Sequence, residues 1–149
     1  MKGRLLVAVQ FACLIALVLT PAANAPTATR FLVARLLVAI AGTILAIAFI
    51  NLRESVTVYP EPRAGVPFIT QGIYKYVRHP MYIGVLLFGA SMVVTKWTLA
   101  SLAVWLVLFA DLQIKYHYED RLLATRWPEA ALYQATVGAL FPKIIAPRP

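Results

Sequence analysis

The sequence predicts an all-α integral membrane protein with about four transmembrane helices, the third and fourth of which form a tight hairpin. Of the 149 residues, 61% are apolar and 13% are charged, whereas soluble domains average about 45–50% and about 25%. The apolar residues gather in four stretches, and most of the charged residues lie beside these stretches. Basic residues outnumber acidic ones, with 14 Lys and Arg and 6 Asp and Glu. This composition excludes intrinsic disorder, and the length fits a single domain.

Each apolar stretch is predicted to be a helix. A transmembrane helix needs about 20 residues, with a range of about 17–25, so the last two reach that length only with their interfacial flanks. The stretches are Leu5–Thr20, Leu36–Leu52 with an extension back to Phe31, Met81–Thr95, and Trp97–Ala110 with an extension to Ile114.

The connections between these helices are short. Pro21 and Pro26 should end the first helix and form the turn into the second, because proline disrupts a helix interior. Lys96 alone separates the third helix from the fourth. The first stretch has a second interpretation: Lys2 and Arg4 precede it and an Ala-x-Ala pattern at 23–25 follows it, as in a cleaved secretory signal.

The distribution of Lys and Arg predicts the orientation in the membrane. With the N-terminus inside, eleven of these residues lie on the inner side and three, Arg30, Arg35 and Lys96, on the outer side. Residues 53–79 and 115–149 should therefore face the cytoplasm. If the source is prokaryotic, the protein should lie in the inner membrane. No basic run is long enough to indicate nucleic-acid binding. The inner residues are Lys2, Arg4, Arg53, Arg63, Lys75, Arg78, Lys115, Arg121, Arg126, Lys143 and Arg148.

The string GIYKYVRHPMYIG at 72–84 is the first candidate site. Pro80 is suited to the first position of a helix, and His79 before it favours extended backbone. A helix N-terminus attracts anions, Arg78 can clamp a carboxylate, and Tyr82 adds a phenol one turn later. The alternative is that these side chains only anchor a helix at the membrane interface.

The string KYHYEDR at 115–121 is the second candidate site. Helical spacing places Asp111, Lys115 and Glu119 on one face, and Tyr116 and Asp120 on the next. Such pairs often do no more than support a solvated helix, and Asp111 is expected to be interfacial rather than buried.

The hairpin at Lys96 should return the carboxylates of Glu119 and Asp120 to the neighbourhood of Arg78 and His79. That arrangement suits a ligand with a carboxylate together with ammonium or hydroxyl groups. A metal site is not expected, since the single cysteine, Cys13, is remote in sequence and the chain has two histidines. His117 is expected at the surface, and Cys13 alone can form no intramolecular disulfide.

The first string resembles the signature of the isoprenylcysteine carboxyl methyltransferase and phospholipid methyltransferase superfamily, small membrane enzymes that use S-adenosylmethionine. The likeness covers about residues 51–142, including a similar lead-in at 57–72. Asp120 replaces a common glutamate, Trp127-Pro128 a common Phe-Gly, and Ala130 a common tyrosine. The fixed positions are met by Gly72, Tyr74, Arg78, His79, Pro80, Tyr82 and Gly84, and the later ones by Glu119, Asp120, Leu123, Tyr133, Phe141 and Pro142.

The resemblance implies one methyltransferase domain over 1–149, with two helices in 1–52 and a catalytic core in 53–142. It implies catalytic roles for Arg78 and Glu119, with Arg78 orienting the acceptor or pairing with Glu119, and no metal. The acceptor would be a lipid-like or small apolar molecule that enters from the bilayer, with isoprenylcysteine carboxyl O-methylation as the nearest activity. S-adenosylmethionine would be held by His79, Pro80, Tyr82, Gly84, Glu119 and Asp120.

Three alternatives stay open at this point. One is phospholipid N-methylation, and another is an NADPH-dependent membrane sterol reductase, since such enzymes share an Arg-His-Pro string followed by an aromatic residue. The third is a small membrane protein without enzymatic activity. The sequence leaves the oligomeric state open. It also leaves the methyl acceptor open, and the candidates are a prenylcysteine carboxylate, a phospholipid amine, a thiol and a small apolar acid.

Overall fold

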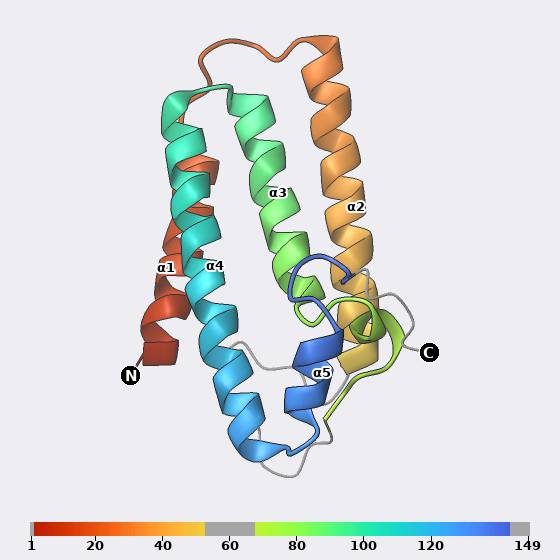
Figure 1. Cartoon of the computed structure of the whole chain (residues 1–149). Coiled ribbons are helices and arrows are strands. Elements are labelled where there is room, and N and C mark those ends of the chain that lie inside the picture. The colour runs from red at the N-terminus through yellow and green to blue at the C-terminus, as the bar shows by residue number, and fades with distance from the viewer. Residues whose placement is uncertain (1, 53–67, 144–149) are drawn as a thin grey trace.

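A computed structural model describes residues 2–52 and 68–143 and shows them to be helical, with no strand beyond an isolated parallel bridge between Val77 and Gly138 (Figure 1). The predicted all-α class is confirmed for these residues. The proline-rich segment at 53–67 and the end of the chain at 144–149 lie outside the described residues. The helices are α1 (Lys2–Leu19), α2 (Ala28–Leu52), the short 3₁₀ helix η2 (Gly72–Lys75), α3 (Pro80–Lys96), α4 (Leu99–Arg126) and α5 (Ala130–Thr136).

The hairpin between α3 and α4 is tight, as predicted, but it uses two residues beyond Lys96. Trp97 adopts a left-handed conformation with φ of 53°, and the side chain of Thr98 accepts a hydrogen bond from the backbone N–H of Ser101 at 3.1 Å. A left-handed residue after the last turn and a threonine N-cap are standard helix boundaries. The fourth helix therefore begins at Leu99 and not at Trp97.

At the other end α4 runs far past its apolar stretch, to Arg126. Trp127 is extended, with φ of −122° and ψ of 118°, because the following Pro128 disfavours helical backbone at that position. The string at 115–121, to which helical spacing was applied, is thus part of one helix of 28 residues. This length carries Glu119 and Asp120 beyond the apolar part of the bundle.

Helix α2 packs along α3, α1 packs along α4, and α3 also contacts α4. Gly84 permits the close approach of α3 to α2, since a Cβ atom at this position would lie 2.5 Å from Cγ of Leu45. Gly42, the glycine of a small-xxx-small pattern in α2, faces open space, with nothing within 4 Å of an added Cβ. The buried core between α1 and α4 consists of Cys13, Leu17, Leu108 and Leu112.

The bundle keeps large apolar side chains on its outer surface. Two helices, α2 and α4, are long and apolar enough to cross a membrane, and α1 and α3 are shorter apolar helices. At 1.5 Å per residue, the 17 residues of α3 extend about 26 Å, close to the hydrocarbon thickness of about 30 Å. The four-span count and the orientation remain predictions. The exposed apolar side chains include Leu5, Phe11, Ile15, Phe31, Leu36, Ile47, Phe49, Leu102, Leu106 and Val107.

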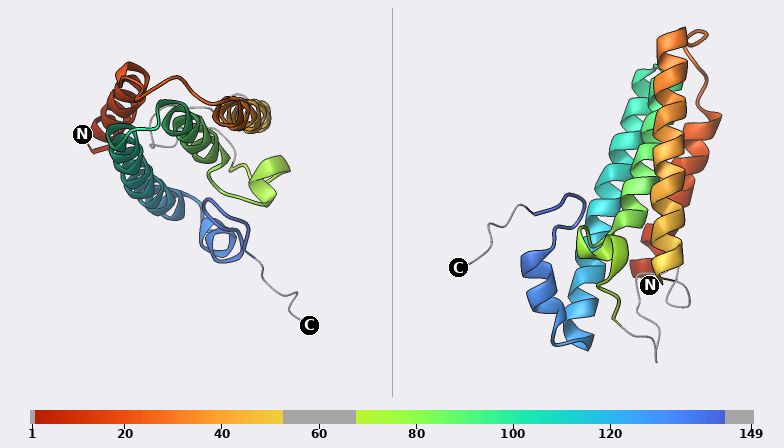
Figure 2. Two further views of the ribbon diagram at one scale, coloured as in Figure 1. Left: turned by 90° about the horizontal axis from the view of Figure 1, so that it is seen from above. Right: turned by 90° about the vertical axis from the view of Figure 1, so that its right-hand side faces the viewer.

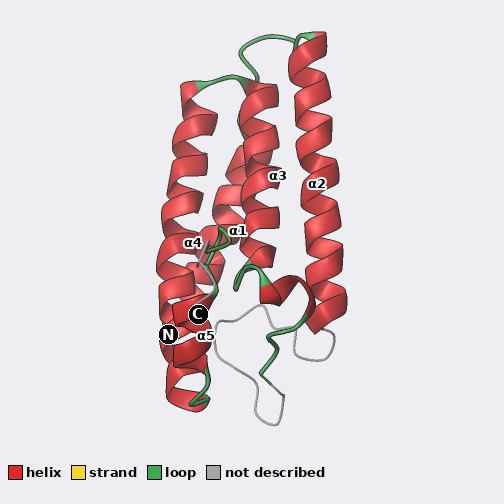
Figure 3. Ribbon diagram, turned by 45° about the vertical axis from the view of Figure 1, so that its right-hand side comes forward, coloured by secondary structure: helices red, strands yellow, loops and turns green. Residues whose placement is uncertain are grey.

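The two ends of the bundle differ in character. One end holds the α1–α2 loop and the α3–α4 turn, and the opposite end holds η2, α5 and the polar part of α4 (Figures 1 and 3). The loop end is closed by hydrogen bonds from Ala23 N to Lys96 O and from Lys96 Nζ to Val18 O, both 3.0 Å. The candidate residues all lie toward the other end.

Candidate functional site

The candidate site forms where the start of α3 meets the polar part of α4. Pro80 occupies the first helical position of α3, as predicted, so Arg78 and His79 stand directly before the helix. The α3–α4 hairpin brings these two residues beside Glu119 and Asp120. The predicted juxtaposition is confirmed by direct hydrogen bonds.

Arg78 is bound to the acidic pair and to the C-terminal segment. Its Nη2 donates to Oδ2 of Asp120 at 2.7 Å, and its Nη1 donates to the carbonyl oxygens of Gln134, at 2.9 Å, and Val137. Of the two roles expected for Arg78, orienting the acceptor or pairing with Glu119, the second is replaced by pairing with Asp120, and the first stays a prediction. The Arg78 side chain is 9% exposed, and its Nε is buried with no hydrogen-bond partner among the described residues.

His79 bridges the two carboxylates. Its Nε2 lies 3.0 Å from Oδ1 of Asp120, and its Nδ1 lies 3.4 Å from Oε2 of Glu119. Burial lowers the pKa of His79, but hydrogen bonds to Asp120 and Glu119 and the charges of these carboxylates outweigh it, so the pKa lies above its ordinary value. This environment favours the imidazolium form, in which both ring nitrogens donate.

Tyr82 completes the contact between the helices. Its hydroxyl donates to Oε2 of Glu119 at 2.7 Å, and its ring stacks on that of His79 with 5.2 Å between centroids. On another side of the ring, Nζ of Lys115 lies 5.2 Å from the centroid and donates to Oε1 of Gln10 in α1 at 2.8 Å. A buried polar chain therefore runs from α1 to the acidic pair.

The segment that follows α5 lies beside the start of α3 (Figure 2). The backbone N–H groups of Arg78 and His79 donate to the carbonyls of Gly138 and Ala139 at 2.9 and 3.0 Å. Burial raises the pKa of Tyr133 to about 12, so its hydroxyl stays protonated and donates to the carbonyl of Tyr74 at 2.6 Å. The C-terminal segment thus holds the motif in place through the backbone.

The remaining predicted residues lie as follows. Pro80 is buried at the start of α3, and Gly84 is buried against Leu45. His117 is exposed, as expected. Asp111 is 5% exposed, so the interfacial placement expected from the sequence was wrong, and its Oδ2 has no hydrogen-bond partner among the described residues.

Sequence reasoning missed two glutamines that hold the site. Gln134 donates from Nε2 to the carbonyl of Asp120 at 2.7 Å, and its own carbonyl accepts from Arg78. Gln10 accepts from Lys115 and is 9% exposed. A polar residue inside an apolar stretch, as at Gln10, is itself a signal of a buried contact. Nothing in the local sequence distinguishes Gln134.

The polar cluster consists of Arg78, His79, Tyr82, Glu119 and Asp120. Chemically, it offers a cation and a protonatable ring beside two carboxylates. The side chains of Arg78, His79 and Asp120 are 9%, 6% and 12% exposed, whereas that of Glu119 is 23% exposed. Glu119 is therefore the most accessible of these four groups. The carboxylates can accept hydrogen bonds from ammonium or hydroxyl groups, and Arg78 and His79 can donate to a carboxylate.

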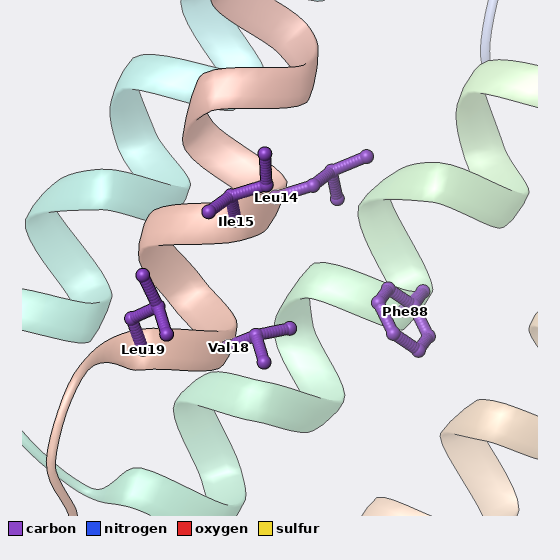
Figure 4. A pocket seen from close by; sticks show the side chains of 5 residues that line it. All are labelled: Leu14, Ile15, Val18, Leu19 and Phe88. Carbon is purple, nitrogen blue, oxygen red and sulfur yellow. The ribbon is translucent and has the colours of Figure 1, made fainter.

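A separate apolar groove lies between α1 and α3 (Figure 4). All of its lining side chains are apolar, and none belongs to the polar cluster. The groove can therefore contact hydrocarbon, and its lining side chains carry no acidic, basic or nucleophilic group. The lining residues are Leu14, Ile15, Val18, Leu19 and Phe88.

Comparison with known proteins identifies the family. A family model described as phospholipid methyltransferase matches residues 29–130, which is more than half of the chain and contains both candidate strings. The chain belongs to the phospholipid methyltransferase family. Membership points to a methyltransferase, and together with the two long apolar helices it indicates a membrane protein.

The chain is also similar to the cobalt-zinc-cadmium resistance protein CzcN of Cupriavidus metallidurans, with 34% identity over 94 residues. The aligned part is 58% of this chain and 40% of that relative. The chain therefore spans well under half the length of the curated protein that it matches.

Proposed function

We propose that this protein is an S-adenosylmethionine-dependent methyltransferase that acts on a lipid-like or small apolar acceptor at the cytoplasmic face of the membrane. The observation that carries the proposal is the direct bonding of Arg78, His79 and Tyr82 to Glu119 and Asp120 inside the region matched by the family. The nearest activity is carboxyl O-methylation of an isoprenylcysteine.

The residues present fit this cofactor. Its amino-acid portion carries a carboxylate and an ammonium group, and its ribose carries hydroxyls. Arg78 Nε is a buried donor with no partner among the described residues, and Glu119 is a partly exposed acceptor. We assign cofactor binding to His79, Pro80, Tyr82, Gly84, Glu119 and Asp120.

S-adenosylmethionine would supply an electrophilic methyl carbon, which a nucleophilic atom of the acceptor would attack in line as the carbon–sulfur bond breaks and S-adenosylhomocysteine leaves. The protein's task is therefore alignment and the exclusion of water, not the formation of a covalent enzyme intermediate. Glu119 is placed to contact the reactants, because its side chain is more exposed than those of Arg78, His79 and Asp120. Arg78 is buried and fully engaged through its two terminal nitrogens, which favours a positioning role that acts through Asp120.

The test is methyl transfer from labelled cofactor into a lipid extract, followed by identification of the product. Glu119→Gln should abolish most of the transfer, and Glu129→Gln, a matched change at an exposed position of the C-terminal region, should leave it unchanged. Absence of labelled product from the wild-type protein, together with stabilisation by NADPH and not by S-adenosylhomocysteine, would support the reductase instead. Absence of any ligand effect would favour a protein without enzymatic activity.

Phospholipid N-methylation is the second candidate, because the matching family carries the name phospholipid methyltransferase. A labelled phospholipid amine in the same experiment would select it over carboxyl methylation. The name of the relative CzcN refers to cobalt, zinc and cadmium resistance. In the part of the chain that the structure describes, no group of three or more His, Cys, Asp or Glu is placed to hold a metal ion.

A further inference from the structure

We propose that Lys115 is a positioning residue of this site, and that Gln10 of α1 holds its ammonium group against Tyr82 on the Glu119 side of the cluster. The inference deepens the proposed methyltransferase function and rests on it. It makes α1 part of the site, although the family match begins at residue 29 and leaves α1 out.

The contacts form a continuous chain across three helices. Lys115 Nζ donates to Gln10 Oε1 at 2.8 Å and lies 5.2 Å from the centroid of the Tyr82 ring. The Tyr82 hydroxyl donates to Glu119, whose Oε2 lies 3.4 Å from Nδ1 of His79. Cations attract aromatic faces at such separations, and more strongly where water is excluded. Lys115 is 3% exposed and Gln10 is 9% exposed, so water is largely absent here.

Packing alone does not explain a lysine at this position. The interface between α1 and α4 already has an apolar core that includes Leu17 and Leu108, both fully buried. Burying an ammonium group is costly unless partners compensate, and an apolar residue of similar length often packs at least as well. Lys115 stands between two acidic residues one turn away on the same helix, and both Glu119 and Asp111 act on it electrostatically.

The consequence is a fixed orientation for the accessible carboxylate. Glu119 is shared between the Tyr82 hydroxyl and the His79 ring, and the positive charge of Lys115 one turn earlier on the same helix attracts its carboxylate. A neutral side chain at 115 would leave Tyr82 without its cation and Glu119 without this charge. Loss of Gln10 would remove the 2.8 Å hydrogen bond that ties the ammonium group to α1 beside the ring.

The test compares Lys115→Met and Gln10→Leu with Lys115→Arg and with Leu17→Ala, a packing change in the same α1–α4 interface. Calorimetry with S-adenosylhomocysteine should show about 10-fold or more weaker binding for the first two variants, the range set by one hydrogen bond to a charged group. Lys115→Arg should restore affinity to within a few-fold. Leu17→Ala should lower thermal stability and leave affinity within about two-fold, since the Leu17 side chain takes part in none of the hydrogen bonds of the polar chain.

A second readout does not depend on the cofactor. The chain has two histidines, so in a His117→Gln background the ring ¹⁵N resonances report His79 alone. Lys115→Met and Gln10→Leu should shift them and their titration, and Leu17→Ala should not. Gln10→Leu keeps Lys115. It therefore tests the positioning role even if Lys115→Met does not fold.

Equal behaviour of Gln10→Leu and Leu17→Ala in both readouts would overturn the positioning role. If the wild-type protein fails to bind S-adenosylhomocysteine, the proposed function falls, and the His79 resonances still decide whether Lys115 and Gln10 organise the cluster.

Discussion

The polar cluster at the start of α3 shares two carboxylates among three donors. Arg78 and His79 both use Asp120, while His79 and Tyr82 both use Glu119. Such sharing means that removal of one donor changes the charge balance of its neighbours, so single substitutions should act beyond their own contacts.

Arg78→Lys should destabilise the protein by about 1.5–3 kcal/mol, the range for lost hydrogen bonds to charged groups. A single ammonium nitrogen lacks the planar fork that reaches Asp120 and the carbonyl of Gln134 together. Hydrogen exchange should speed up at the backbone amides of residues 78 and 79, which bind the C-terminal segment. Arg121→Lys, at an exposed position of the same helix as Asp120, is the control and should change neither property.

The raised pKa of His79 predicts how stability depends on pH. A group whose pKa is higher in the folded than in the unfolded state stabilises the fold fully below its unfolded value of about 6.5. That contribution is lost as the pH rises through the folded pKa. Thermal unfolding in detergent should therefore show the wild-type protein losing more stability above about pH 6.5 than His79→Gln does. A parallel pH dependence in the two proteins would contradict the charged bridge, and His117→Gln should behave like the wild type.

The sequence was sufficient to predict that the strings at 72–84 and 115–121 meet. It was not sufficient to predict which carboxylate pairs with which donor. Successive residues of a helix point about 100° apart, so a small rotation of α4 decides whether Glu119 or Asp120 faces Arg78. The burial of Asp111 was missed for a related reason. Its exposure depends on how α1 covers that face of α4, which local sequence does not encode.

At the scale of elements, long apolar stretches predicted the four long helices, Pro21 and Pro26 predicted the turn between the first two, and Lys96 marked the turn between the last two. The short elements were not predicted. Helix α5 has seven residues, too few for a clear periodic pattern, and it is held by contacts such as that of Gln134 with Asp120. The 3₁₀ helix depends on the Asn51 side chain, which accepts from the backbone N–H of Ile73 at 2.8 Å, and on the positive φ of 61° at Gly72.

Gly84, which lies against α2, and Gly42, which faces open space, give opposite predictions for substitution by alanine. Gly84→Ala should destabilise the protein by about 1–3 kcal/mol, because the added Cβ would lie 2.5 Å from Leu45 Cγ and 3.3 Å from the Ala41 carbonyl. Gly42→Ala meets no atom within 4 Å and should be neutral or stabilising by up to about 1 kcal/mol. Thermal unfolding in detergent checks both. If Gly84 also approaches the cofactor, Gly84→Ala should weaken S-adenosylhomocysteine binding beyond what its stability loss explains.

At the scale of the whole molecule, the fold separates an apolar bundle from one polar end. The cluster, η2 and α5 lie at that end, and the turn at Lys96 lies at the opposite end (Figure 1). This polarity suits an enzyme that takes a water-soluble cofactor from one side and an apolar acceptor from the bilayer. It also makes the predicted orientation testable, because the two ends should be accessible from different sides.

Cysteine labelling tests this orientation. Cys13 is the single cysteine and is 7% exposed, so its replacement by alanine gives a clean background. In sealed inverted and right-side-out vesicles, Lys96→Cys should react with a membrane-impermeant thiol reagent only from the outside, and Leu132→Cys in α5, 70% exposed, only from the cytoplasmic side. The reason is the excess of Lys and Arg near the polar end, which the positive-inside rule keeps in the cytoplasm. Labelling of both positions from one side would rule out an odd number of crossings between residues 96 and 132, and exchange of the two sides would place the polar end, with its candidate site, outside the cytoplasm.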